Sequence, residues 1–360
     1  MFDLSQQITA AYYPGKSPVP GNRSQTTGPE KGTEAKSHAL WMSYPARKRC
    51  AVLAILFPLD ETGSDYGVVL TQRSPALRTS PSVSAFPGGR LDAADNNDEW
   101  ACALREAHEE IGFDPANVPG FERLAISPCY LSLGNDAVRM CICKATPKVD
   151  LIVANNEPDA ISTAHKVGPE TGKGEEISVE KVSPKEPAFL KHLAPKPSPT
   201  EVAVAYAVPL SCILTNKWYV RGTPMLVAGH PWIFHKYRVP VGDVLGLVRS
   251  HAVTPAEINS AYQDSDEEIE EEMRQQASAP EPTEEVPQWT TRTPTSLKYT
   301  PGEKAIPLHG LTSHMVVDLA RALHPGQKVL FEVLPQLGSD EIVSQYHAET
   351  YGPNNSGSSL

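Results

Sequence analysis

Three carboxylates crowd one face of a predicted helix in the stretch ALREAHEEIGF, which runs from Ala103 to Phe113. Glu106 lies three residues before Glu109 and four before Glu110, so in a helix the three side chains share one surface. Like charges at this spacing repel by roughly a few tenths of a kcal/mol per pair. The cluster is therefore costly near a core unless a positive group lies among the carboxylates.

Two kinds of positive group could balance this cluster. One is Arg105, four residues before Glu109. The other is a divalent cation, because Mg²⁺ and Mn²⁺ take carboxylate oxygens and commonly keep phosphate oxygens in the remaining positions. A solvent-exposed helix with one Arg–Glu pair is the plainer alternative, and the helix alone favours it. The upstream glycines Gly88 and Gly89 shift the balance, because paired glycines let a backbone come close to a ligand or metal.

The hydrophobic pattern predicts the elements that must position these residues. Short apolar runs predict strands at 50–57 and 68–74, and further strands are expected at 124–127 and 138–145. The acidic helix is expected from about 98 to 111.

The ends of the predicted helices carry recognisable signals. Asn97 or Asp98 is expected to cap the start of the acidic helix, and Gly112 stands at the usual position after its end. Apolar residues recur at three-to-four spacing over 308–323, which predicts a closing amphipathic helix.

These elements indicate one α/β (α+β) core rather than two domains. Residues 1–38 are rich in Gly, Pro, Ser, Thr and Gln and are expected to be disordered. The core domain is expected over 39–323, with polar insertions at about 147–198 and 255–303. Residues 324–360 form a C-terminal extension.

Composition limits the classes of partner. The 360-residue chain has a formal net charge of −11, which argues against nucleic-acid binding because that needs a basic surface. No run is long enough for a membrane-spanning helix, and no signal segment opens the chain. The six cysteines show no disulfide spacing, and Cys141 and Cys143 are expected to pack on a strand. We expect a soluble intracellular protein with reduced thiols and no membrane partner; its oligomeric state cannot be read from the sequence.

The stretch GGRLDAADNNDEWACALREAHEEIGF resembles the Nudix box, whose pattern is Gly, five residues, Glu, seven residues, then Arg-Glu-apolar-x-Glu-Glu-x-Gly-apolar. Counted from Gly89, the first Glu of the pattern falls on Asp95, and nine residues rather than seven separate it from Arg105. A lengthened loop explains this difference but leaves the role of Asp95 open. The second half matches at every position: Arg105, Glu106, Ala107, Glu109, Glu110, Gly112 and Phe113.

The resemblance implies a Nudix-type α/β/α sandwich with a mixed central sheet, and hydrolysis of a nucleoside diphosphate linked to another group with Mg²⁺ or Mn²⁺. It implies that Glu106 and Glu110 bind metal directly and Glu109 directly or through water. The carbonyl of Gly88 could complete the shell. Arg105 would orient Glu109, and Glu106 is the first candidate for the general base. A carboxylate from a later loop is the alternative base.

The preceding segment LTQRSPALRTSPSVSAFPGG is similar to the signature of the coenzyme A diphosphatase branch of this family. Arg73 and Arg78 could clamp an anionic phosphate, or could form structural salt bridges. Ser80 and Ser82 stand where the branch usually has His and Gly, and Ser82 and Gly89 are candidate substrate-binding positions. The matching residues are Leu70, Thr71, Arg73, Ser74, Leu77 and Arg78.

Later segments resemble the same branch. Glu201 in SPTEVAVAYAVPL matches an acid of the branch, although a surface acid at a strand edge is the plainer interpretation. Gly310, Leu311 and Thr312 match a Gly-Leu-Thr helix start. The chain ends in Ser-Ser-Leu, which is close to a peroxisomal Ser-Lys-Leu signal but lacks its basic residue. Cytoplasmic, peroxisomal and mitochondrial locations therefore all stay open.

The leading hypothesis is a small-molecule hydrolase that cuts coenzyme A or acyl-CoA to 3′,5′-ADP and (acyl-)4′-phosphopantetheine. One alternative is a hydrolase of another nucleoside diphosphate derivative, such as NADH or ADP-ribose. A second alternative is a non-catalytic Nudix-fold scaffold, against which the intact glutamates argue.

Overall fold

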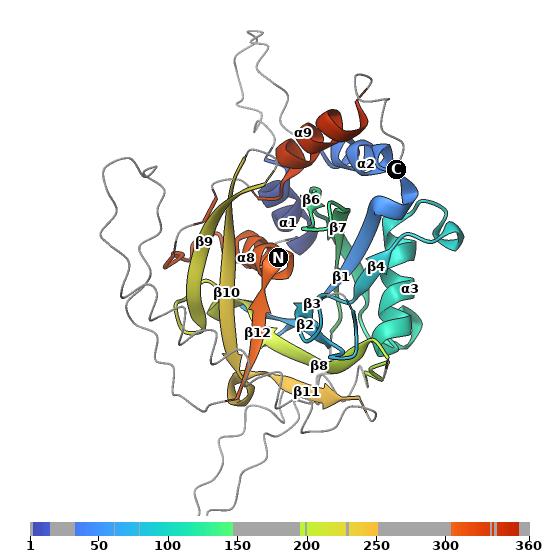
Figure 1. Ribbon diagram of the computed structural model, residues 1–360. Helices are drawn as coiled ribbons and strands as arrows, with labels where there is room; N and C mark the ends of the chain where they lie inside the picture. The colour runs from blue at the N-terminus through green and yellow to red at the C-terminus, as the bar shows by residue number, and fades with distance from the viewer. Residues whose placement is uncertain are drawn as a thin grey trace, which may run out of the picture.

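A mixed β-sheet carries the acidic helix on one of its faces (Figure 1). Its strand order is β11-β8-β2-β1-β7-β5, and β1 and β7 are parallel while the other pairs are antiparallel. Short strands β3, β4 and β6 pair with β2, β1 and β7. The strands are β1 (Arg49–Pro58), β2 (Tyr66–Arg73), β3 (Ser84–Ala85), β4 (Gly88–Arg90), β5 (Glu122–Ile126), β6 (Tyr130–Leu131), β7 (Ala137–Lys144), β8 (Val202–Pro209) and β11 (Gly246–Arg249). The mixed sheet of the predicted fold class is confirmed.

The computed structural model describes residues 3–14, 33–60, 62–78, 80–146, 195–198, 200–227, 230–250, 304–331, 333–334 and 337–352. Most of the two predicted insertions and the C-terminal Ser-Ser-Leu lie outside these residues.

The four predicted strands are confirmed as β1, β2, β5 and β7. Almost every side chain of β1, β2 and β7 is buried or nearly so. A strand covered on both faces needs apolar residues at successive positions, and this is why these segments read as continuous apolar runs instead of alternating ones. Cys141 and Cys143 are buried on β7, and all six cysteines are free thiols.

The predicted acidic helix is α3 (Glu99–Ile111). The Asp98 carboxylate caps it by accepting from the backbone N–H groups of Trp100 and Ala101. At the other end, Gly112 has φ +69°, the left-handed conformation that glycine adopts without steric cost. The apolar face of α3, which includes Ala103, Ala107 and Ile111, packs on the sheet.

The remaining strands form a second, separate sheet in the order β12-β10-β9. Helix α8 lies between the two sheets (Figure 1). The strands of the second sheet are β9 (Tyr219–Val227), β10 (His230–Pro240) and β12 (Ala305–His309). The predicted closing helix is α8 (Gly310–Leu323), which begins two residues later than expected because residues 305–309 pair with β10. Most of its side chains are buried, as its position between two sheets requires.

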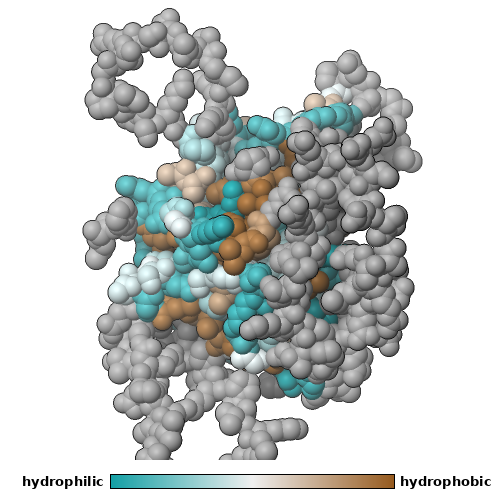
Figure 2. All heavy atoms as spheres, turned by 90° about the vertical axis from the view of Figure 1, so that its left-hand side faces the viewer, coloured by the Kyte–Doolittle hydropathy of each residue, from teal (hydrophilic) through white to brown (hydrophobic). Residues whose placement is uncertain are grey.

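Short helical turns connect the larger elements. They are α6 (Leu210–Ile213), η1 (Ala46–Lys48), η2 (Ala93–Asp95), η3 (Pro115–Asn117) and η4 (Val241–Asp243). On the side of the molecule where β9 lies, hydrophobic and hydrophilic residues are interleaved at the surface (Figure 2). Within the described residues, no helix is both long enough and apolar enough to cross a membrane.

The expectation that residues 1–38 are disordered is wrong for the described parts of that segment. Helix α1 (Leu4–Tyr12) buries Ile8 completely and leaves Tyr12 4% exposed. Gln7 donates its side-chain N–H to the last carbonyls of α8, at Ala322 and Leu323. The local composition is polar, but the few apolar side chains lie on one face and are buried in the core.

Two further helices extend the core at the chain ends. Helix α2 (Glu34–Ser43) begins inside the segment predicted to be disordered and buries Trp41. Helix α9 (Asp340–Tyr351) belongs to the predicted C-terminal extension and buries Ile342 and Val343 next to α2. Figure 1 shows α2 and α9 side by side at one end of the molecule.

The packing of α1 can be tested with Ile8→Ala. Removing a fully buried side chain leaves a cavity, so we expect the free energy of unfolding to fall by about 2–5 kcal/mol. Urea unfolding followed by circular dichroism measures the change. Gln6→Ala, on the exposed side of the same helix, is the control. Equal stabilities for the two variants would mean that α1 does not pack on the core.

Candidate active site

Two adjacent glycines bring the backbone of β4 against both β1 and the acidic helix. A Cβ atom at Gly88 would lie 2.5 Å from Val52 Cα and 2.6 Å from the Ala51 carbonyl oxygen. A Cβ atom at Gly89 would lie 2.5 Å from the carboxyl carbon of Glu106. Real Cβ atoms essentially never come this close to another heavy atom, so the first glycine is required by the sheet and the second by a glutamate of α3.

The carboxylate of Glu110 is buried behind these glycines. Its Oε2 accepts a 3.0 Å hydrogen bond from the Gly88 N–H, and the residue is 7% exposed. Burial raises the pKa of Glu110 to about 8, the Gly88 N–H lowers it, and the charge of Glu106 raises it further. The structure therefore holds this carboxyl where its own charge is poorly solvated.

The carboxylate of Glu106 experiences similar crowding. Its pKa is raised first by burial, is lowered by Arg105, and is raised by the charges of Glu109 and Glu201. Glu109 is more exposed, with 53% of its side chain accessible. Negative charge thus accumulates over the last two turns of α3.

Arg105, which the sequence pairs with Glu109, contacts three carboxylates. Its Nη1 lies 3.0 Å from Glu106 Oε1 and 3.0 Å from Glu109 Oε2. Its Nε and Nη2 lie 2.8 and 2.9 Å from the two carboxylate oxygens of Asp95. The planar guanidinium thus makes a two-pronged ion pair with Asp95 and uses its remaining nitrogen for the helix acids.

Asp95, whose role the sequence leaves open, is buried and is the strongest partner of Arg105. The hydrogen bond from Arg105 is the main cause that lowers the pKa of Asp95. Asp92 and Asp95 form a reciprocal capping box across η2. Asn96 and Asn97 follow in the left-handed conformation, which asparagine tolerates. The lengthened loop therefore still delivers the carboxylate, and the Asp-x-x-Asp spacing was the sequence signal for it.

The donor atoms in this cluster suit a hard divalent cation, since all are carboxylate oxygens beside a glycine backbone. Within the described residues, however, no three His, Cys, Asp or Glu side chains are arranged to hold a metal ion. Glu106 and Glu109 instead both contact Arg105. The residues of the cluster fit such an ion in chemical type.

Arg73 and Glu201 lie near the same carboxylates. They stand where β2 ends and β8 begins, and the Ser74 N–H donates to the Glu201 carbonyl over 2.8 Å. Arg73 lowers the pKa of Glu110, and Glu201 raises it, which places both charges within electrostatic reach. The structure thus brings the upstream arginine segment to the acidic helix.

The remaining predicted substrate residues lie on the loop after β2. Arg78 and Ser80 are exposed there. Ser80 and Ser82 have φ values of +49° and +59°, a conformation that costs a non-glycine residue roughly 1–3 kcal/mol. The loop therefore keeps a glycine-like backbone although serine stands at both positions. The Ser82 carbonyl accepts from the Gln72 side chain over 3.1 Å, which helps to hold this shape.

Comparison with known proteins identifies the segment that carries this cluster. The NUDIX domain family matches residues 48–193. A probable nudix hydrolase of Schizosaccharomyces pombe is 42% identical over 71 residues, which are 20% of this chain and 25% of that protein. The mitochondrial Nudix hydrolase 15 of Arabidopsis thaliana is 45% identical over 71 residues, 20% of this chain and 24% of that protein.

A third relative is the peroxisomal coenzyme A diphosphatase of Mus musculus, 42% identical over 65 residues, 18% of this chain and 27% of that protein. All three matches span well under two thirds of the relatives' lengths. Among solved structures, the Ap4A hydrolase of C. elegans matches with a TM-score of 0.22 and 20% identity over 28% of this chain and 67% of that chain. A likeness this low supports no conclusion about activity.

The role of Asp95 can be tested with Asp95→Asn, which removes the charge that faces Arg105. We expect the free energy of unfolding at neutral pH to fall by about 1.5–3 kcal/mol, as for a charged hydrogen bond. Because the folded-state pKa of Asp95 is lowered, this stability is present above the unfolded pKa of about 3.9 and is lost as the pH falls through the folded value.

The difference between wild type and Asp95→Asn should therefore shrink in acid, as measured by urea unfolding at several pH values. Asp92→Asn, on the exposed side of the same loop, is the control, because asparagine caps as well as aspartate. A difference that does not change with pH would show that the Asp95 charge is not what stabilises the loop.

Proposed function

We propose that this chain is a metal-dependent diphosphatase that hydrolyses coenzyme A or acyl-CoA to 3′,5′-ADP and (acyl-)4′-phosphopantetheine. The observation that carries the proposal is the backbone contact between the two segments, in which the Ser74 N–H donates to the Glu201 carbonyl and the Ser198 N–H donates to the Glu110 carbonyl, each over 2.8 Å. It joins the arginine segment typical of coenzyme A diphosphatases to the glutamates of the Nudix box in one place. The partial likeness to the mouse peroxisomal coenzyme A diphosphatase supports the same substrate.

The proposed cofactor is Mg²⁺ or Mn²⁺, since Nudix hydrolases generally use divalent metal ions. When bound, such an ion would offset the charge of the diphosphate and lower the pKa of an attacking water. Glu106 and Glu110 would hold it directly, Glu109 directly or through water, and the Gly88 carbonyl would be a further ligand. Arg105 would keep its ion pair with Asp95 while the helix acids turn away.

The chain's own residues divide the remaining work. Water adds to one phosphorus, the bridging P–O bond breaks, and one proton must leave the water. Glu106, whose pKa is raised by burial, is the first candidate to accept that proton. Glu201 is the alternative, because it is a carboxylate from a later part of the chain whose charge reaches both Glu106 and Glu110.

Substrate would be held by residues of β4, of the end of β2 and of the loop that follows β2. Arg73 and Arg78 supply positive charge for the phosphates, and Gly89 and Ser82 supply backbone that a substrate can approach. No nucleic-acid or membrane partner is proposed. The cellular location stays a prediction, because the Ser-Ser-Leu end lies outside the described residues.

A second candidate function is hydrolysis of another nucleoside diphosphate derivative, such as NADH or ADP-ribose. Ser80 and Ser82 favour it, because they replace residues of the coenzyme A signature. The left-handed backbone at Ser82, where the signature has glycine, argues for the first candidate. A scaffold without activity is disfavoured, because Glu106, Glu109 and Glu110 are all present.

A substrate panel separates these functions. The full chain with Mg²⁺ or Mn²⁺ is given coenzyme A, acetyl-CoA, NADH and ADP-ribose, and the products are separated by chromatography. We expect 3′,5′-ADP from coenzyme A. Glu110→Gln should lower the rate by roughly 100-fold or more without unfolding the protein. His108→Gln, at an exposed position of the same helix, is the control. Intact coenzyme A beside cleaved NADH would overturn the substrate, and an unchanged Glu110→Gln rate would overturn the metal site.

The two glycines of β4 offer a second test. A Cβ atom at Gly88 meets backbone, so Gly88→Ala should lower the free energy of unfolding by about 1–3 kcal/mol or more. A Cβ atom at Gly89 meets the end of the flexible Glu106 side chain, so Gly89→Ala should fold almost normally and displace that carboxylate. We expect its turnover to fall roughly 10- to 100-fold. Thermal unfolding and turnover of both variants check this, and wild-type turnover in Gly89→Ala would contradict the placement of Glu106.

A further inference from the structure

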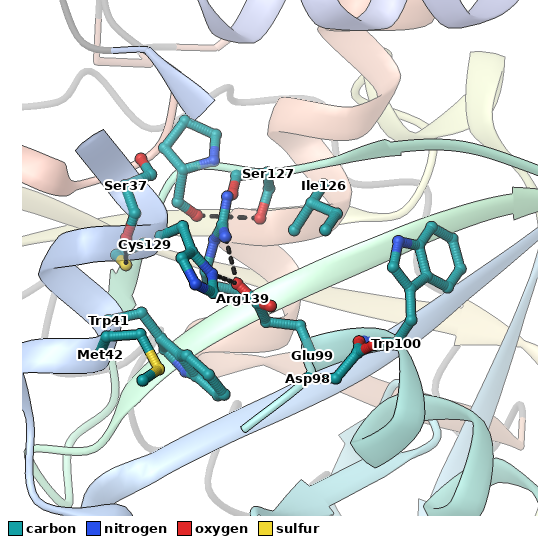
Figure 3. Close-up of polar contacts among 12 residues, drawn as sticks. Ser37, Trp41, Met42, Asp98, Glu99, Trp100, Ile126, Ser127, Cys129 and Arg139 are labelled. Atoms are coloured by element: carbon teal, nitrogen blue, oxygen red, sulfur yellow. Dashed lines mark hydrogen bonds and ion pairs between the residues drawn. The ribbon is translucent and has the colours of Figure 1, made fainter. Parts of the chain in front are cut away.

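The N-terminal end of α3 is tied into the core by a buried ion pair (Figure 3). Glu99, the first residue of the helix, is 4% exposed, and Arg139 on β7 is completely buried. Nη1 of Arg139 donates to Glu99 Oε1. Figure 3 shows the two side chains meeting between α2, α3 and β7.

Arg139 uses its other nitrogens to join α1 to the same point. Its Nε donates to the Ser127 carbonyl over 3.1 Å, and its Nη2 lies 3.2 Å from the Tyr13 hydroxyl. The Tyr13 hydroxyl in turn donates to the Ile126 carbonyl over 3.0 Å. The rigid guanidinium fork thus fixes the end of α1, the start of α3 and the chain after β5 relative to one another.

Helix α2 reaches the same carboxylate from the outside. His38 Nδ1 lies 2.7 Å from Glu99 Oε1, and the His38 side chain is 46% exposed. One turn on, Trp41 Nε1 donates to the Cys50 carbonyl of β1 over 3.1 Å. Both α1 and α2 precede residue 48, where the Nudix match begins. Two helices outside the matched segment therefore reach the buried ion pair: α2 contacts Glu99 through His38, and Tyr13 at the end of α1 contacts Arg139.

The far end of α3 is held by other means. The Lys196 N–H donates to the Ile111 carbonyl and the Ser198 N–H to the Glu110 carbonyl, each over 2.8 Å. Between these two ends α3 is a continuous helix, in which Glu106 stands seven residues beyond Glu99, or about 10 Å along the axis. Because Glu99 and the three glutamates belong to one continuous helix, we expect a displacement at Glu99 to shift the carboxylates as well.

A buried ion pair is a poor source of net stability, because the cost of desolvating both charges offsets their attraction. Its geometric value is larger, since a guanidinium and a carboxylate satisfy each other in few orientations. The Glu99–Arg139 pair therefore suits a role in placing α3 better than a role in stabilising the fold.

We propose that Glu99 and Arg139 are positioning residues for the carboxylates of α3, and that His38 and Tyr13 make the N-terminal helices part of the catalytic unit. The inference rests on the proposed function. Metal affinity and turnover should therefore depend on contacts made by α1 and α2, which lie outside the matched domain.

The test uses the full chain as wild type, Glu99→Gln and His38→Ala. Mn²⁺ affinity is measured without substrate by electron paramagnetic resonance, kcat and KM with whichever diphosphate the wild type cleaves, and Tm by circular dichroism. Glu122→Gln is the control. Glu122 lies on β5 and forms an ion pair with Lys144 on β7, the strand that also carries Arg139, so this pair joins two strands and not a helix to a strand.

For Glu99→Gln we expect Mn²⁺ affinity and kcat to fall roughly 10- to 100-fold, the range for residues that orient metal ligands. KM should stay within about twofold, because a lost orienting contact that acts in the transition state lowers kcat without weakening ground-state binding. His38→Ala should show a smaller change in the same direction, and Glu122→Gln none. A fall in Tm alone, with wild-type Mn²⁺ affinity and kcat, would overturn the proposal.

His38→Ala decides the matter if Glu99→Gln does not fold, because it leaves the buried pair intact and removes only a half-exposed side chain. Wild-type Mn²⁺ affinity and kcat in that variant would overturn the inference while the proposed function stands. A wild type that binds no Mn²⁺ and cleaves no diphosphate would instead overturn both.

Discussion

The contact of Arg105 with Asp95, Glu106 and Glu109 is the interaction on which the candidate site depends. Glu109 and Glu110 stand in the last turn of α3, where the negative end of the helix dipole already disfavours carboxylates. Burial and mutual repulsion raise the cost of ionising Glu106 and Glu110 further. Such a surface is tolerable only with a cation close by, and in this structure Arg105 is that cation.

Several unrelated parts of the chain hold this charged helix at a constant distance from the sheet. Gly88 lets β4 lie against β1, and the missing side chain of Gly89 leaves the space that Glu106 occupies. The buried Glu99–Arg139 pair holds one end, and the backbone at Lys196 and Ser198 holds the other. The last residues of the first predicted insertion thus contact the end of α3, and Glu201 follows them three residues later.

The helices and the second sheet outside the matched domain enlarge its core and are continuous with it. Helix α8 contacts β10 on one side and α1 on another. The Gln7 side chain of α1 donates hydrogen bonds to the last carbonyls of α8. Ser84 donates to the Pro307 carbonyl over 2.6 Å, which links β3, next to the loop after β2, to the second sheet. Direct contacts therefore connect the terminal helices to the surroundings of the site.

Structural features that depend only on residues close together in the chain could be predicted from the sequence. The four strands, α3 with its Asp98 cap and Gly112 end, and the facing carboxylates all follow from local hydrophobic spacing and helix-end chemistry. The order of α1 and α2 could not, because three or four apolar side chains in a polar segment form a helix only when a core covers them.

The partners of the charged residues were likewise decided only by the tertiary structure. Asp95 meets Arg105 after a loop of unexpected length, His38 meets Glu99 across 61 residues, and Tyr13 meets Arg139 across 126. No local pattern carries such pairings, because a buried charge selects its partner by proximity and desolvation in the folded core. The sequence by itself determined which side chains have the chemical groups for a reactive site. The fold determined which of these side chains lie close enough to interact electrostatically.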